Sequence, residues 1–132
     1  MTTFSAIGIA GTGVTVSRTW MDAISDNISN INDATSTSGA AFQERYIIAQ
    51  PASDGNGAQV GGALFGSATG RVVYEPSNPL ADAKGYVRYP DIDLSSQMGQ
   101  MIMAQRGYEM NLSVVDRARD AYQSAIQLGR NA

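Results

Sequence analysis

Few side chains of this 132-residue chain are able to do covalent or acid–base chemistry. There is no histidine and no cysteine, and Lys84 is the one lysine. Mechanisms that need an imidazole, a thiolate nucleophile, a disulfide or a thiolate metal site are therefore excluded. A Ser-Lys variant of the catalytic triad is the arrangement of that kind that the composition still allows.

The remaining candidates for acid–base chemistry are carboxylates that lie close in sequence to Tyr86 and Tyr89. They are Glu75, Asp82, Asp91 and Asp93. A pair of carboxylates is able to serve as general acid and general base. We favour a structural interpretation, because Asp91 and Asp93 directly precede a predicted helix, where side-chain oxygens accept hydrogen bonds from unpaired backbone amides.

A short glycine motif, Gly11-Thr12-Gly13, resembles the start of a dinucleotide-binding loop. The pattern lacks its third glycine, no predicted strand precedes it, and no P-loop lysine follows it. We interpret these small residues as positions that allow helices to pack closely. With so little reactive chemistry in the chain, we expect no enzymatic activity, no cofactor, no metal site and no small-molecule substrate.

The charge balance argues against nucleic acid as a partner. The chain has 9 Lys and Arg residues against 12 Asp and Glu, for a net charge of −3 and a sequence pI near 4.7, whereas phosphate binding requires a basic patch. No apolar run approaches the ~20 residues of a membrane span. Residues 1–10 lack the basic start and the long apolar stretch of a secretory signal, so we expect any export to use another route.

Two segments must position whatever this chain binds, and the first covers residues 4–32. Its apolar residues recur every seven positions in two series, which are Ile7, Val14, Met21 and Ile28 and, at an offset of three, Ala10, Ile24 and Ile31. This spacing predicts an amphipathic helix. Gly8, Gly11 and Gly13 each cost ~0.5–1 kcal/mol relative to alanine in a helix interior. We therefore expect this helix to need a packing partner.

The second segment, residues 93–129, is the strongest predicted element, because an apolar repeat of seven residues continues over more than four heptads without a proline. The repeat consists of Leu94, Met101, Tyr108, Val115 and Tyr122, with Ala104, Ala118 and Ala125 at the three-residue offset and Met98, Leu112 and Ile126 at the four-residue offset. Such a helix is on the order of 55 Å long. Its stripe is longer than that of the N-terminal helix, and the surplus apolar surface predicts oligomerisation.

Between the two helices the composition favours short strands and loops. Extended runs are predicted at residues 41–49, 70–75 and 86–89, and loops at 33–40 and 50–62. The predicted fold is mainly α with a small β-rich insert, and its terminal amphipathic helices pair as an antiparallel or offset coiled coil. The segments are residues 1–33 (N-terminal helix and Asn-rich motif), 34–92 (β and loop insert) and 93–132 (long C-terminal helix), in one structural unit.

Polar and sulfur-containing side chains interrupt or border the C-terminal stripe. The polar ones are Gln105, Arg106, Asn111 and Arg119, and the sulfur-containing ones are Met98, Met101, Met103 and Met110. Polar groups in a helix seam more often set register and partner choice than catalyse a reaction. The methionines are equally consistent with an adaptable binding groove and with ordinary core packing.

Several short segments of the chain carry motifs that recur in one known protein family. Residues 24–32 (ISDNISNIN) are similar to the Asn-rich motif near the N-terminus of rod and hook proteins. Residues 91–94 (DIDL) and 101–112 (MIMAQRGYEMNL) are similar to the C-terminal motif of these proteins. Residues 74–79 (YEPSNP) and 84–90 (KGYVRYP), together with the chain length, resemble the proximal-rod members. Over nearly its whole length the chain therefore resembles the flagellar basal-body rod protein family.

The resemblance implies a structural subunit of the proximal rod, which assembles helically into the drive shaft that crosses the periplasm and transmits motor torque to the hook and filament. The partners that it implies are further copies of the chain, other rod proteins, membrane-ring and export-gate components, and the flagellar type III apparatus, which exports such proteins without a cleaved signal peptide. The residues expected to form the assembly seam are Ile24, Asn27, Ile28, Asn30, Ile31, Asp93, Leu94, Met98, Met101, Gln105, Arg106, Tyr108, Asn111, Leu112, Val115 and Tyr122.

Two other classes of function remain open at this point. One is a coiled-coil adaptor or assembly module of a related type III secretion apparatus, which would form a closed oligomer instead of joining rod partners. The other is an enzyme, which would need a pocket of clustered carboxylates within residues 33–92.

Overall fold

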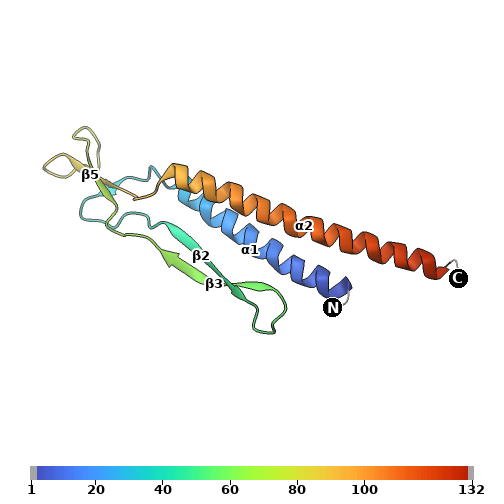
Figure 1. The fold of residues 1–132 in the computed structure, drawn as a ribbon. Coiled ribbons are helices and arrows are strands. Elements are labelled where there is room, and N and C mark those ends of the chain that lie inside the picture. Colours follow the sequence, from blue (N-terminus) through green and yellow to red (C-terminus); the bar gives the residue numbers. More distant parts are fainter. Residues whose placement is uncertain (1–2, 131–132) are drawn as a thin grey trace. The chain divides into compact units, whose positions relative to one another are not determined.

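The computed structural model describes residues 3–130, and the predictions for residues 1–2 and 131–132 lie outside this range. The elements in chain order are α1 (Thr3–Ser29), β1 (Thr35–Ser36), β2 (Arg45–Pro51), β3 (Ala58–Phe65), β4 (Arg71–Tyr74), β5 (Tyr86–Tyr89) and α2 (Leu94–Arg130) (Figure 1). Two helices therefore flank a small β-rich middle, which confirms the predicted order of helices and strands. The described part of the chain has no helix with the length and hydropathy of a membrane span.

The chain divides into two compact units, and both helices and the β2–β3 hairpin contribute to each. Of the described residues, the first unit contains 3–21, 48–62 and 102–130, and the second contains 22–47 and 63–101. The first unit thus holds the longer part of each helix and the tip of the hairpin. The second holds the end of α1, the start of α2, the base of the hairpin and the other strands.

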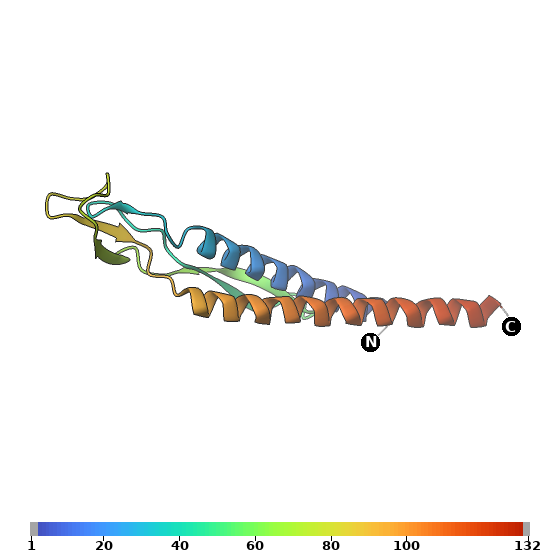
Figure 2. The same ribbon diagram turned by 90° about the horizontal axis from the view of Figure 1, so that it is seen from above.

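In the first unit α1 and α2 run antiparallel. Gly13 faces Asn111, and four residues further along α1 Ser17 faces Gly107, which lies four residues earlier on α2. Ala104 on α2 is fully buried. Both views show α2 running on beyond the N-terminal end of α1 (Figures 1 and 2). The C-terminal turns of α2 consequently have no described α1 residue opposite them.

The tip of the β2–β3 hairpin is attached to α1 through Thr12, also in the first unit. The Thr12 hydroxyl accepts a hydrogen bond from the backbone amide of Ala58 at 3.0 Å and donates one to the carbonyl of Ile9 at 2.6 Å. Gly57 lies so close to Thr12 that a Cβ at position 57 would overlap the hydroxyl. This contact holds the start of β3 against the helix.

The second unit contains a three-stranded sheet in the order β1-β5-β4 with antiparallel neighbours. Thr35 pairs with Arg88 on one side of β5, and Val73 pairs with Val87 on the other. The apolar core of this unit is small and consists of Ala23, Ile24, Ala41, Val87 and Ile92. Because this apolar core is small, polar contacts are also needed to hold the helices and the strands of this unit together.

Three predictions for the middle of the chain differ from the structure. Residues 58–62, predicted as loop, belong to β3, and the strand predicted at 41–49 is β2 at Arg45–Pro51. Residues 35–36, predicted as loop, form β1 by pairing with β5. The reason is that Gly61, Gly62 and the polar residues near them carry little β-propensity of their own, so pairing with a neighbouring strand decides their conformation.

Candidate assembly site: a polar junction and the faces of the long helix

Asn27 joins the end of α1 to the start of β2. Its side chain is 1% exposed, and its amide forms two hydrogen bonds to one residue of the backbone. Asn27 Nδ2 donates to the Arg45 carbonyl at 3.0 Å, and the Arg45 amide donates to Asn27 Oδ1 at 2.8 Å. The side chain thereby takes the place of a neighbouring strand, since it satisfies both backbone groups of Arg45. An exposed ion pair between Arg45 and Asp26, with a distance of 2.9 Å, adds little to this attachment.

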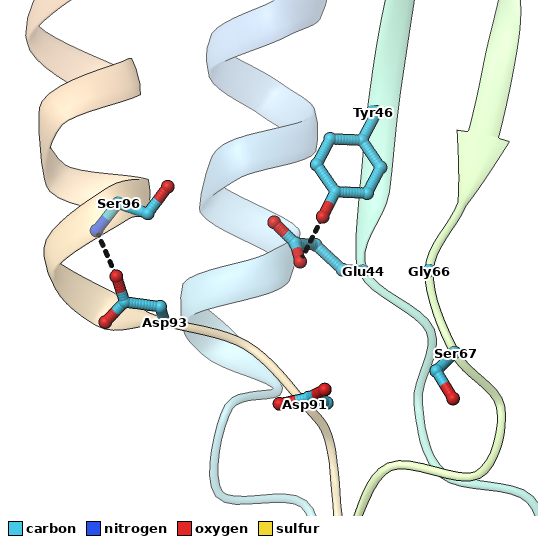
Figure 3. Close-up of a pocket in the computed structure, with 7 residues that line it drawn as sticks. All are labelled: Glu44, Tyr46, Gly66, Ser67, Asp91, Asp93 and Ser96. Atoms are coloured by element: carbon cyan, nitrogen blue, oxygen red, sulfur yellow. Dashed lines mark hydrogen bonds between the residues drawn. The ribbon is translucent and has the colours of Figure 1, made fainter.

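The same amide continues into a chain of buried polar groups that reaches α2. Asn27 Nδ2 also donates to Gln97 Oε1 at 2.9 Å, and Gln97 Nε2 donates to Glu44 Oε1 at 2.6 Å. The Tyr46 hydroxyl donates to the other carboxylate oxygen of Glu44 at 2.5 Å (Figure 3). Gln97 is fully buried and Glu44 is 9% exposed. We call these residues, Asn27, Glu44, Arg45, Tyr46 and Gln97, the polar junction; all of them lie in the second unit.

The electrostatics of the polar junction affect one tyrosine strongly. The hydrogen bond to the Glu44 carboxylate, followed by partial burial and the negative charges of Glu44 and Asp91, raises the pKa of Tyr46 from 10.0 to about 12. Because this pKa is higher in the folded state, the stabilisation by the Tyr46–Glu44 bond is complete below pH 10 and is lost as the pH rises toward 12.

We predict that Glu44→Gln returns the pKa of Tyr46 toward its ordinary value. Neutralising Glu44 removes the anion that opposes ionisation of the phenol. The measurement is a spectrophotometric titration at the tyrosinate absorbance, with Tyr46→Phe identifying the component that belongs to Tyr46. An unchanged titration curve in Glu44→Gln would contradict the bond.

An open cavity next to the polar junction is lined by Glu44, Tyr46, Gly66, Ser67, Asp91, Asp93 and Ser96 (Figure 3). Asp93 is already engaged, because its carboxylate accepts hydrogen bonds from the backbone amides of Ser95 at 3.3 Å and Ser96 at 3.0 Å. Of the two predicted candidates for the helix cap, Asp91 and Asp93, the structure therefore assigns the role to Asp93. Within residues 3–130 no group of His, Cys, Asp or Glu has the arrangement of a metal site.

The other carboxylates near the tyrosines hold turns and loops. Asp82 accepts hydrogen bonds from the backbone amides of Tyr86 and Lys84 and from the Thr37 hydroxyl. The Tyr86 amide, followed by the Thr37 hydroxyl, lowers the pKa of Asp82. Glu75 accepts a hydrogen bond from the Tyr89 hydroxyl at 3.0 Å, which raises the pKa of that phenol. These contacts agree with the structural interpretation of the acidic residues.

The expected seam residues fall into two groups that differ in their exposure to solvent. Those that are buried or half-buried are Ile24, Asn27, Ile28, Asn30, Ile31, Met101, Tyr108, Asn111 and Val115, and those that are exposed are Asp93, Leu94, Met98, Gln105, Arg106, Leu112 and Tyr122. Asn30 Nδ2 donates to the carbonyl of Asp26 at 2.8 Å, in the turn that follows the end of α1. The heptad series at Met101, Tyr108 and Val115 therefore faces inward, whereas the four-residue offset at Met98, Leu112 and Ile126 faces outward.

The sequence patterns did not indicate four residues of the polar junction, which are Glu44, Arg45, Tyr46 and Gln97. Gln97 stands one heptad before Ala104, in the series that continues through Asn111 and Ala118, so the register of the helix contained a signal for it. No comparable pattern marked Glu44 or Arg45, whose roles depend on contacts with residues far away in the chain.

Comparison with known proteins shows which protein family this chain belongs to. A family profile described as the C-terminal region of the flagellar basal body rod FlgEFG proteins matches residues 83–128. The flagellar basal-body rod protein FlgC of Agrobacterium fabrum is 33% identical over 129 residues, which cover 94% of this chain and 93% of that protein. This chain belongs to the FlgC family. FlgC of Yersinia enterocolitica is 29% identical over 98% of this chain and all of its own length, and FlgC of Borreliella burgdorferi is 29% identical over 95% and 96%.

Membership of the FlgC family identifies the chain as a structural subunit of the flagellar basal-body rod and locates it in the basal body. An adaptor of another secretion apparatus is not favoured, because the FlgC relatives match nearly the whole chain. The region that matches the FlgEFG profile includes the helix cap Asp93 and most of α2. Residues of both the inward and the outward face of α2 therefore lie in the region that matches rod proteins.

Proposed function

We propose that this rod subunit works mechanically and without catalysis, by packing the outward face of α2 against neighbouring subunits. The observation that carries the proposal is the amount of apolar surface that α2 leaves exposed. Its exposed large apolar residues include Met98, Ile102, Met103, Met110, Leu112, Ile126 and Leu128, with Met110 at 68% and Leu128 at 73%. Large exposed apolar surfaces on otherwise polar proteins mark sites of association.

The C-terminal turns of α2 add to this surface. Counting from the contact of Gly13 with Asn111, the described start of α1 at Thr3 stands opposite residue 121. Residues 122–130 are all exposed. Within this stretch Ala125 and Ile126 continue the apolar repeat, and we propose that helices of neighbouring subunits cover these two side chains.

The wider assembly follows from this surface. A contact between different faces of identical subunits that does not close into a ring produces a helical tube. We propose that copies of this chain join one another and other basal-body components in this way. In this proposal residues 1–33 and 93–132 form the inner coiled coil, residues 34–92 lie outside it, and the subunit reaches the periplasm through the flagellar export apparatus.

We predict that Ile126→Asp blocks assembly and leaves the fold of the subunit intact. Ile126 is 46% exposed, so a charge there costs the monomer little, whereas burial of a large apolar side chain at each repeated contact contributes about 1.5–3 kcal/mol. The measurement is swarming on soft agar after complementation of a strain without its own copy of the protein. We expect loss of swarming.

Gln127→Asp is the matched control, because residue 127 is also exposed but polar. It should support normal swarming. Both purified variants should keep the helix content and the Tm of the unaltered protein. Normal swarming with Ile126→Asp would show that this face of α2 is not an assembly surface.

A further inference from the structure

One helical glycine in α1 lies in close contact with a polar side chain of α2. A Cβ on Gly13 would lie 2.5 Å from Asn111 Oδ1, 2.6 Å from its Cγ and 2.7 Å from its Nδ2. The Asn111 amide occupies the space that a Cβ would take, so any side chain at position 13 would force this amide to move. Both residues lie in the first unit.

The two neighbouring glycines of α1 do not have this role. A Cβ on Gly8 or Gly11 would meet nothing within 4 Å. All three glycines weaken the helix to a similar degree, because each lacks the side chain that restricts the unfolded backbone. Gly13 is the one of these three that the packing against α2 requires.

The Asn111 side chain is held in position by its own helix. Its Nδ2 donates to the carbonyl of Gly107, one turn earlier, at 2.8 Å. Gly107 in turn faces Ser17, since a Cβ on Gly107 would lie 3.1 Å from Ser17 Oγ, and Ser17 is 8% exposed. Two consecutive turns of the helix pair thus each combine a glycine on one helix with a polar residue on the other.

We propose that the Gly13–Asn111 contact, supported by Ser17 and Gly107, fixes the axial register of α1 against α2. Sliding the helices by one heptad would move Asn111 from Gly13 to a position opposite Ala6 or Trp20. The amide would then face the methyl group of Ala6 or the indole of Trp20, and it would lose the open space that Gly13 provides. A single polar residue in a helix seam is known to specify register in this way.

The register has a consequence for the rod subunit, because it decides which residues of α2 remain uncovered by α1. The inference concerns contacts inside one subunit, so it stands or falls independently of the proposed packing between subunits. A slip of one heptad would cover or uncover two turns of α2.

The first experiment compares three identical substitutions in one helix. Gly8→Ala and Gly11→Ala should leave the Tm unchanged or raise it, because alanine favours the helix and the space is open. Gly13→Ala should lower the Tm by about 4 °C or more, and Asn111→Ala in the Gly13→Ala background should restore most of the loss. A Gly13→Ala variant as stable as Gly11→Ala, or a loss that Asn111→Ala does not relieve, would overturn the proposal.

The second experiment reads the register directly, and the absence of native cysteine makes it possible. In a disulfide the Cβ of one cysteine lies about 3 Å from the sulfur of the other, which matches the 3.1 Å between a Cβ on Gly107 and Ser17 Oγ. The double variant Ser17→Cys with Gly107→Cys should therefore form an intramolecular disulfide on mild oxidation. Ser17→Cys with Val114→Cys, one heptad further on α2, should not.

Substitution of Asn111 tests whether the contact holds this register. Adding Asn111→Leu should reduce the 17–107 disulfide severalfold and allow the 17–114 disulfide to form. Unchanged yields of both disulfides would show that the register does not depend on Asn111. Failure of the 17–107 pair to form in the protein that retains Asn111 would contradict the contact itself.

Discussion

Replacing Asn27 with alanine should lower the free energy of unfolding by about 3 kcal/mol. The substitution removes the side chain that bonds both backbone groups of Arg45 and also leaves Gln97 Oε1 without its donor. Asn27 and Gln97 are almost completely buried, so water does not readily replace the lost bonds. Urea unfolding of the purified subunit, followed by far-UV circular dichroism, measures the change.

Asn30→Ala is the matched control, since Asn30 belongs to the same Asn-rich segment. Its side chain bonds only the carbonyl of Asp26 within an exposed turn. The stability of this variant should stay within about 0.5 kcal/mol of the unaltered protein. Equal losses for Asn27→Ala and Asn30→Ala would mean that the polar junction does not hold the second unit together.

The second large effect is expected for Gly70→Ala, at the residue before β4. Gly70 has a φ of +58°, a conformation that costs a residue with a Cβ roughly 1–2 kcal/mol. A Cβ there would also overlap the carbonyl oxygen of Tyr89 and lie 2.7 Å from the Cβ of Ala41. Neither the Tyr89 carbonyl nor the Ala41 Cβ is able to move aside without a shift of the backbone. We therefore expect the free energy of unfolding to fall by about 3 kcal/mol or more.

Gly55→Ala separates the two causes of this loss. Gly55 has a φ of +74° but no atom within 4 Å of a Cβ. The control should therefore show the conformational cost alone, about 1 kcal/mol. Unfolding in urea measures both variants. If Gly70→Ala and Gly55→Ala prove equally stable, the close approach of Tyr89 and Ala41 to Gly70 is not present in solution.

The helices were predictable because their signal is local. The heptad series in α1 and α2 repeats at the helix period, and the inward residues Ala10, Ile24 and Ala104 are buried as that period requires. A cap by Asp91 or Asp93 was predictable for the same reason, since a capping side chain lies within three residues of its donors, as Asp93 does. The family membership also followed from short motifs within the helices and the β5 segment.

The strand β3 and the polar junction were not predictable from local pattern. Residues 58–62 are extended because they pair with β2, and a sequence rich in glycine does not encode that partner. Glu44 and Gln97 meet although 53 positions separate them, and Asn27 and Arg45 meet across 18. Nothing in the residues near Glu44 distinguishes it from an exposed surface carboxylate.

The sequence by itself determined the two amphipathic helices, a cap at the start of α2, the absence of histidine and cysteine, and the membership of a rod protein family. Periodicity, capping and composition act over a few residues, so they can be read without the fold. The tertiary structure alone decided which face of α2 is covered, that Asn27 holds the backbone of Arg45, and that Gly13 leaves room for Asn111. These depend on the register of elements distant in the chain, and register is set by packing between whole elements.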